Sequence, residues 1–191
     1  MSTILDEADR SLAETLKRLR ESRGWSLTDL AAKSGVSRAM IHKVESGASS
    51  PTAALLGRLS GAFGLTVSQL LIEVEGGQSR VARAENNPVW VDPETGFRRR
   101  VLSPVSFAGH LELIEGELPP GAAIAYPASA YQFLEHQILV LFGELTFVEG
   151  DTRHKLRVRD CLALGAATNC EYRNEGRITC RYIVALARRA T

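Results

Sequence analysis

A short stretch between Gly35 and Gly47, GVSRAMIHKVESG, carries side chains that can read the edges of DNA bases. Arginine can donate two hydrogen bonds to the O6 and N7 atoms of guanine, and an alanine methyl can contact the methyl of thymine. Arg38 and Ala39 stand near the start of the stretch, and His42 follows one helical turn after Arg38. The pattern predicts a surface that contacts base edges in a duplex. The alternative is a set of solvated side chains on an ordinary helical bundle.

Other polar side chains around this stretch suit the phosphate backbone better than the bases. Ser37 can cap a helix and touch a phosphate, and Lys43 is placed for a phosphate contact. The full set of predicted DNA contacts is Thr28, Ser37, Arg38, Ala39, His42, Lys43, Ser49 and Ser50.

The elements that would position these side chains follow from apolar spacing and capping residues. The residues expected to be buried along the stretch are Val36, Met40, Ile41 and Val44. Ser26, with Asp29 three residues later, opens a preceding helix in a capping box. Gly35 ends that helix, where a left-handed residue is needed. Two helices joined by a short turn with glycine form a helix-turn-helix unit.

The spacing of apolar residues changes once along the chain, and this change divides the chain into two domains. Helices are expected over 5–23, 26–34, 37–46, 51–63 and 67–72, so residues 1–72 form an all-α domain. Residues 73–87, EVEGGQSRVARAENN, read as a linker. After Pro88 the period is two, and strand candidates cover 89–91, 98–104, 110–118, 137–151, 154–164, 170–174 and 178–186. The prediction is a two-domain α+β chain whose residues 88–191 form an all-β sandwich or barrel.

Charge and cysteine content restrict the class of protein. The 191 residues carry a net charge of +1, but residues 11–66 hold eight Lys and Arg against four acidic residues. This mild excess suits a nucleic-acid module fused to a neutral domain. Three cysteines without CxxC spacing indicate reduced thiols in a cytoplasmic protein. Neither a long apolar run nor a signal-peptide pattern is found, so we expect a protein that is neither exported nor membrane-spanning.

The front half resembles a known family. LKRLRESRGWSLTDLAAKSGVSRAMIHKVESGASSPTAALLGRLSGAFGL is similar to the λ-repressor-like helix-turn-helix domain of xenobiotic-response-element (XRE) transcription regulators. The resemblance implies a homodimer that reads an inverted-repeat operator in double-stranded DNA, with residues 37–46 as the recognition helix. It also implies a structural ion pair between Arg20 and Glu45. Leu27 stands where many members carry a glutamine that contacts DNA, so helix two should contribute less here.

The back half resembles a cupin barrel of the kind often fused behind such a domain. The matching residues are ILVLFGELTFVEGDTRHKLRVRDCLAL followed by CEYRN. Many cupins bind a metal through HxH, a glutamate and a later histidine. Here the HxH region, AYPASAYQFLE, contains no histidine, His136 stands at the glutamate position and Cys170 at the later histidine position. Two possible ligands fall short of a zinc site, so we expect no metal, no other cofactor and no enzyme.

What remains in the back half is a cavity lined by alternate residues of the barrel. His136, Ile138 and Val140 should share one face of a strand, with Cys170 and Tyr172 on a neighbouring strand. Tyr126 and Tyr131 are expected on the loop that replaces HxH, as a lid. The predicted effector-binding residues are Tyr126, Tyr131, His136, Cys170 and Tyr172. The alternative is that these residues only pack the core and the barrel serves to dimerise.

Together these features predict a sequence-specific DNA-binding transcription regulator whose cupin domain binds a small-molecule effector, mediates dimerisation, or both. One alternative is a non-sensing repressor or antitoxin-like module with a structural barrel. A metal-dependent cupin enzyme is the second alternative, and it would need a ligand beyond His136 and Cys170.

Overall fold

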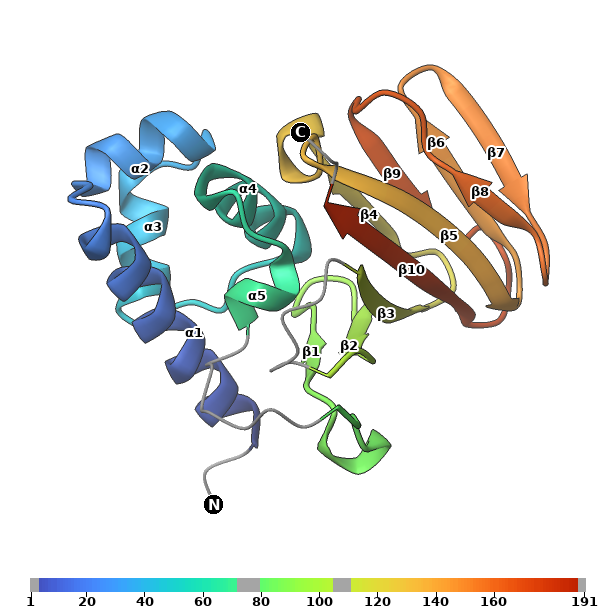
Figure 1. The fold of residues 1–191 in the computed structure, drawn as a ribbon, viewed down its shortest axis with the longest axis horizontal. Helices are drawn as coiled ribbons and strands as arrows, with labels where there is room; N and C mark the ends of the chain where they lie inside the picture. The colour runs from blue at the N-terminus through green and yellow to red at the C-terminus, as the bar shows by residue number, and fades with distance from the viewer. Residues whose placement is uncertain (1–3, 72–79, 105–110, 189–191) are drawn as a thin grey trace.

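The computed structural model describes residues 4–71, 80–104 and 111–188, which form a helical domain beside a β domain (Figure 1). The helices are α1 (Ile4–Ser22), α2 (Leu27–Ser34), α3 (Arg38–Glu45), α4 (Ala53–Phe63) and α5 (Val67–Leu71). Among the described residues, no helix is both long and apolar enough to cross a membrane.

The helix boundaries follow the capping residues of the sequence. Ser26 and Asp29 form the predicted capping box at the start of α2, and Gly35 ends α2 with a φ of 66°. Buried apolar side chains from every helix then share one core, which includes Leu12, Leu16, Leu30, Val36, Ile41, Val44, Leu56, Leu59, Phe63 and Leu70. Met40 does not join this core, contrary to expectation, because it lies on the outer side of α3 and is 37% exposed.

The β domain consists of two antiparallel sheets packed face to face. Its strands are β1 (Val89–Val91), β2 (Arg98–Val101), β3 (Leu111–Leu118), β4 (Ala123–Tyr126), β5 (Leu134–Phe142), β6 (Leu145–Glu149), β7 (Thr152–Leu156), β8 (Cys161–Ala163), β9 (Cys170–Arg173) and β10 (Cys180–Arg188). One sheet has the order β1-β2-β3-β10-β5-β8 and the other β4-β9-β6-β7. From β3 to β10 this is the jelly-roll arrangement that cupins share. The predicted two-domain α+β fold is confirmed.

Two details of the predicted β domain are wrong. Cys170 and Tyr172 do not lie on a strand next to β5, because β5 pairs with β10 and β8 whereas β9 pairs with β4 and β6. They belong to the opposite sheet and face His136 across the barrel. The second error concerns Tyr126, which ends β4, a strand that the sequence did not reveal. Tyr131 lies in the turn before β5, outside any strand as predicted, and is only 6% exposed.

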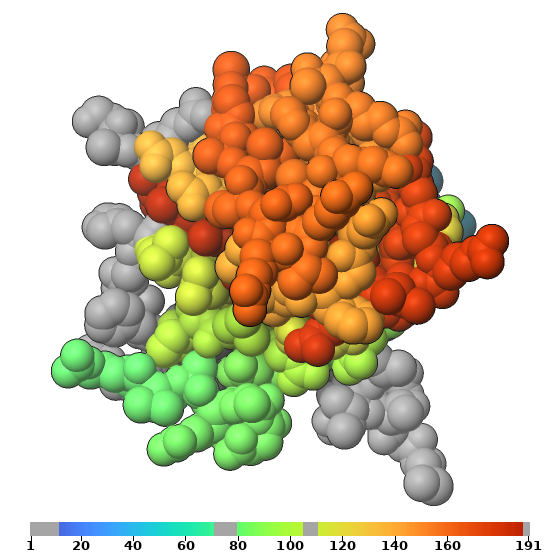
Figure 2. All heavy atoms as spheres, turned by 90° about the vertical axis from the view of Figure 1, so that its right-hand side faces the viewer, coloured from blue at the N-terminus to red at the C-terminus, as the bar shows by residue number. Residues whose placement is uncertain are grey.

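The helical domain packs against one end of the barrel, where β4 and β10 end. Its helices α4 and α5 lie on the side that faces the barrel (Figure 1). Figure 2 shows the opposite end, where side chains of β6, β7 and β8 face the viewer. Residues 73–79 of the predicted linker lie outside the described residues. Within residues 80–87, Ala84–Asn86 form a short 3₁₀ helix, η1.

Candidate nucleic-acid interface and interdomain cavity

The outer side of α3 presents the side chains that the sequence assigns to DNA. Ser37 caps α3 by accepting a hydrogen bond from the Met40 backbone N–H at 3.2 Å. The predicted contacts Thr28, Ser37, Arg38, Ala39, His42, Lys43 and Ser50 are exposed, and Ser49 is half-buried. Because residues three and four apart on a helix are neighbours, Arg38, Ala39, His42 and Lys43 form one continuous surface.

An ion pair fixes this helix to α1. Arg20 donates from Nε and Nη2 to the two carboxylate oxygens of Glu45, both at 2.8 Å, and from Nη1 to the Trp25 carbonyl at 2.9 Å. The two side chains are 12% and 7% exposed, so the pair is largely shielded from water. This is the ion pair that the family resemblance implied, and it holds the C-terminal end of α3 in place.

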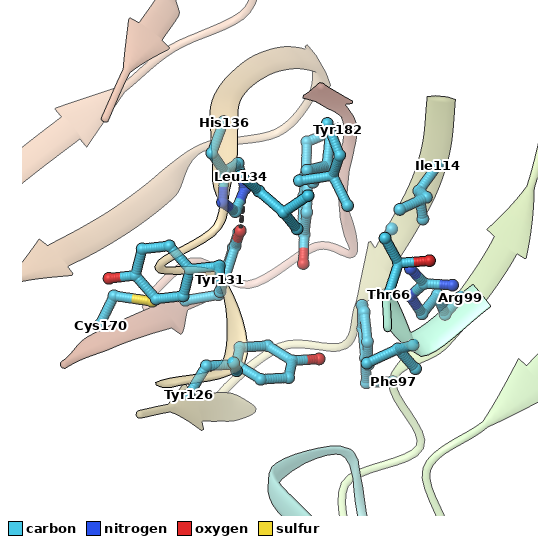
Figure 3. Close-up of a pocket in the computed structure, with 16 residues that line it drawn as sticks. Thr66, Phe97, Arg99, Ile114, Tyr126, Tyr131, Leu134, His136, Cys170 and Tyr182 are labelled. Atoms are coloured by element: carbon cyan, nitrogen blue, oxygen red, sulfur yellow. Dashed lines mark hydrogen bonds between the residues drawn. The ribbon is translucent and has the colours of Figure 1, made fainter. Parts of the chain in front are cut away.

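A cavity lies where the β domain meets the helical domain (Figure 3). His136, Tyr126 and Cys170 stand on one side of it, and Thr66, Arg99 and Phe97 on the other. Its volume is about 620 Å³, including the part open to solvent. All five predicted effector-binding residues line it, namely Tyr126, Tyr131, His136, Cys170 and Tyr172. The mostly apolar lining is typical of small-molecule sites.

His136 joins the two sheets across this cavity. Its Nε2 lies 2.8 Å from the Tyr172 hydroxyl oxygen, whereas its buried Nδ1 has no hydrogen-bond partner in the described part of the chain. Burial, helped by the positive charge of Arg99, lowers the pKa of His136 to about 4. The imidazole is therefore neutral at neutral pH.

The remaining polar groups of this wall are also uncharged at neutral pH. Burial raises the pKa of Cys170 to about 11 and raises the pKa values of Tyr126, Tyr131 and Tyr172 above their ordinary range. The Tyr131 hydroxyl donates to the Thr168 carbonyl and accepts from the Thr168 N–H at 3.2 Å. These groups therefore offer hydrogen bonds and aromatic surface rather than charge.

This donor set does not fit the metal that many cupins carry. The Nε2 atom of His136 is hydrogen-bonded to the Tyr172 hydroxyl, and Cys170 is the second possible metal ligand. No group of three or more His, Cys, Asp or Glu side chains with metal-binding geometry occurs among residues 4–71, 80–104 and 111–188. A zinc site takes at least three protein ligands, so His136 and Cys170 fall short of one.

The sequence interpretation missed a charged cluster at the opposite wall, of which Arg99 and Thr66 line the cavity. Arg99 of β2 donates from Nη1 to the Ser68 hydroxyl at 2.6 Å, and its Nη2 lies 3.6 Å from Glu112 Oε1. Thr66 donates from its hydroxyl to Glu112 Oε2 at 2.7 Å. Arg99 is the middle residue of RRR, and the period of two turns it inward from its neighbours, a signal that could have identified it.

Two glycines of α4, also missed, bring the domains into close contact. A Cβ at Gly57 would lie 2.6 Å from Tyr126 Cδ1, and one at Gly61 would lie 2.4 Å from the Ser129 carbonyl oxygen. Both partners belong to the segment from β4 through η2 (Ala128–Ala130), which also forms a wall of the cavity. The cavity wall and the helical domain are therefore in direct contact.

Comparison with known proteins assigns the helical domain. Residues 16–70 match the helix-turn-helix family HTH_3. The HTH-type transcriptional regulator SutR of Escherichia coli (strain K12) is 48% identical over 63 residues. That match covers 33% of this chain and about a third of the length of SutR.

One solved structure extends the similarity to the whole fold. An HTH_3 family transcriptional regulator from Vibrio cholerae superimposes with a TM-score of 0.79 at 22% identity, covering 97% of this chain and 99% of that chain. The cupin_2 domain of an XRE-family transcriptional regulator from Enterobacter cloacae gives a TM-score of 0.45 at 15% identity, covering 49% of this chain and 98% of that chain. Residues 16–70 of this protein are a helix-turn-helix domain of the HTH_3 (XRE) family.

Proposed function

We propose that this protein is a sequence-specific DNA-binding transcription regulator with a small-molecule effector site in its β domain. The observation that carries the proposal is the outer side of α3, where exposed small and basic side chains lie on an HTH_3 framework. The proposed division is a DNA-binding domain over residues 1–72, a linker over 73–87 and a sensor domain over 88–191.

In the proposed complex, α3 enters the major groove, whose width accepts a helix. Ser37, Arg38, Ala39 and His42 occupy its first two turns, where base edges are within reach. Lys43, Ser49, Ser50 and Thr28 contact phosphates and set the position of the helix along the duplex.

The proposed reader is a homodimer, because one α3 covers only half of an inverted repeat. Two recognition helices must stand about 34 Å apart to enter successive major grooves on one face of the duplex. The outer face of β5 supports pairing of two copies, since Leu139, Leu141 and Phe142 there are 37%, 40% and 51% exposed. Exposed apolar groups gathered on one strand are typical of interaction surfaces.

Selection of bound duplexes from a random pool tests the DNA proposal. We expect an enriched inverted repeat whose half-sites lie about one helical turn apart. The matched control is Arg38→Ala combined with Lys43→Ala, which changes two exposed side chains and should abolish enrichment. A wild-type protein that retains no duplex at modest ionic strength would exclude the function.

A barrel that is purely structural is the second candidate, and the packed tyrosines of the cavity favour it. Tyr172 stacks on Tyr182 with ring centroids 5.3 Å apart and meets Tyr126 edge-on at 6.0 Å. Repeating the selection with cell extract separates the two candidates, because a sensor should change its affinity for DNA when an extract metabolite binds.

A further inference from the structure

We propose that the effector is a small carboxylate with an apolar body, that Arg99 binds its carboxylate group, and that this contact competes with those joining Arg99 to the helical domain. The inference rests on the proposed function and names the chemical class of its effector.

The cavity combines an apolar wall with one cation. Its lining is dominated by aromatic and aliphatic side chains, including Phe97, Ile114, Leu134, Tyr182 and Val184. His136, Cys170 and the tyrosines are neutral at neutral pH, for the reasons given above, so Arg99 is the ionised group among the described lining residues. An anion with an apolar body complements such a site better than a sugar or a cation does.

Arg99 is buried and only loosely paired, which leaves it able to take a stronger partner. The residue is 6% exposed, and its Nη2 lies 3.6 Å from Glu112 Oε1, beyond hydrogen-bonding distance. Glu112 Oε1 has no hydrogen-bond partner among the described residues. A buried charge is costly unless it is paired and hydrogen-bonded. A ligand carboxylate could accept two parallel hydrogen bonds from the guanidinium, the geometry in which such pairs are strongest.

The positive charge of Arg99 also acts within the cavity. It helps to lower the pKa of His136 from the opposite wall, and it opposes the rise in the pKa of Tyr126 and Tyr182. A carboxylate placed between the two walls would meet this potential directly.

The same guanidinium links the cavity to the helical domain. Its partner Ser68 lies in α5, and Thr66, which binds Glu112, accepts a hydrogen bond from the Gln69 N–H at 3.1 Å at the start of that helix. Thr66 and Val67 themselves line the cavity. A carboxylate that draws Arg99 from Ser68 and Glu112 therefore alters the contact between the β domain and α5.

Calorimetric titration of the full chain with benzoate and hexanoate, each against its uncharged amide, tests the charge requirement. We expect at least one of the two carboxylates to bind about tenfold or more tightly than benzamide or hexanamide, as charge-assisted hydrogen bonds imply. Arg99→Gln should weaken carboxylate binding by a similar factor. Arg98→Gln, an exposed neighbour paired with Glu117, should leave it unchanged. Equal binding of acid and amide, or no binding of either carboxylate, overturns the proposal.

A second variant keeps the test valid if Arg99→Gln folds poorly. Glu112→Gln removes the competing negative charge but keeps an oxygen that can accept from Thr66, so benzoate or hexanoate should bind severalfold more tightly. Unchanged or weaker carboxylate binding by Glu112→Gln contradicts the competition.

Binding of the selected duplex, measured in the same preparations without carboxylate, separates this inference from the proposed function. Intact DNA binding without a carboxylate response overturns only this inference, whereas a carboxylate response without DNA binding overturns the proposed function.

Discussion

Asp92 in the β domain accepts a hydrogen bond from the backbone N–H of Ala53, the first residue of α4, at 3.0 Å between Oδ2 and N. The two residues are 39 positions apart, and Asp92 is 2% exposed. Its Oδ1 accepts from the Glu94 N–H at 2.8 Å, so one carboxylate orders a turn of the β domain and the start of a helix in the other domain. A negative group at a helix N-terminus is stabilising.

Asp92→Ala should lower the free energy of unfolding by about 2 kcal/mol, because it leaves buried N–H groups without acceptors. Asp92→Asn retains acceptor oxygen and should recover part of this loss. Chemical denaturation monitored by circular dichroism measures both, with the exposed Glu94→Ala as the matched control. Equal stability of Asp92→Ala and Glu94→Ala would contradict the role of this hydrogen bond.

Gly61→Ala should separate α4 from η2. The added Cβ would meet the backbone oxygen of Ser129 at 2.4 Å, and a backbone carbonyl cannot move aside as a flexible side chain can. Overpacking of this kind costs about 1–3 kcal/mol, which exceeds the gain of about 1 kcal/mol from replacing a helical glycine with alanine. Thermal unfolding of Gly61→Ala against Gly165→Ala, where the new Cβ makes only an ordinary contact at 3.8 Å, measures the difference. A more stable Gly61→Ala would refute the close packing.

The ion pair between Arg20 and Glu45 predicts non-additive stability effects. Glu45→Gln alone should cost about 2 kcal/mol, because it leaves a largely buried guanidinium without its anion. The double variant Arg20→Met/Glu45→Met should lose less free energy of unfolding than the sum of the losses for Arg20→Met alone and Glu45→Met alone. Denaturant unfolding of the four proteins in a double-mutant cycle gives the coupling free energy. A coupling near zero would mean that the two side chains act independently.

The sequence revealed the domains and most strands because each rests on local signals. Capping residues and apolar spacing placed α2, α3 and α4 within a residue or two of their observed ends. β4 was missed because Ala123–Tyr126 is short and carries two alanines, so its alternation is weak. Met40 was wrongly predicted to be buried. In a helix of only eight residues, the spacing of apolar residues does not fix whether an apolar residue beside the buried ones is itself buried.

The candidate site was only half predictable, for a different reason. The five predicted effector-binding residues line the cavity. For His136, Cys170 and Tyr172 this follows from the sequence, since a strand's period of two fixes which side chains point inward. Arg99, Glu112 and Thr66 come from three distant segments, and their contacts depend on how the domains pack. No local period encodes that packing. The assignment of Cys170 to a strand beside β5 failed similarly, because sheet order is a long-range property.

Arg38→Ala and Lys43→Ala should weaken DNA binding in different ways. Arg38→Ala removes a proposed base contact, so it should cost about 1–3 kcal/mol of binding free energy on the selected operator and little on scrambled DNA. Lys43→Ala removes a proposed phosphate contact, so it should weaken binding to both duplexes and reduce the slope of log K against log salt by roughly one. Fluorescence anisotropy over a range of salt concentrations distinguishes the two. Equal losses on both duplexes for Arg38→Ala would reassign it to phosphate.

His136 should make the stability of the protein depend on pH. Its ordinary pKa of 6.5 falls to about 4 in the folded chain, because burial and then the charge of Arg99 disfavour the imidazolium. Between these values the unfolded chain binds the proton and the folded chain does not, so stability decreases as the pH falls from 6.5 towards 4. The loss should be at most about 1.4 kcal/mol per pH unit. His136→Phe, which cannot titrate, should flatten this part of the profile even though it loses the bond to Tyr172. Urea unfolding of both proteins between these two pH values compares the slopes, and identical slopes would mean that His136 is already solvated in the folded chain.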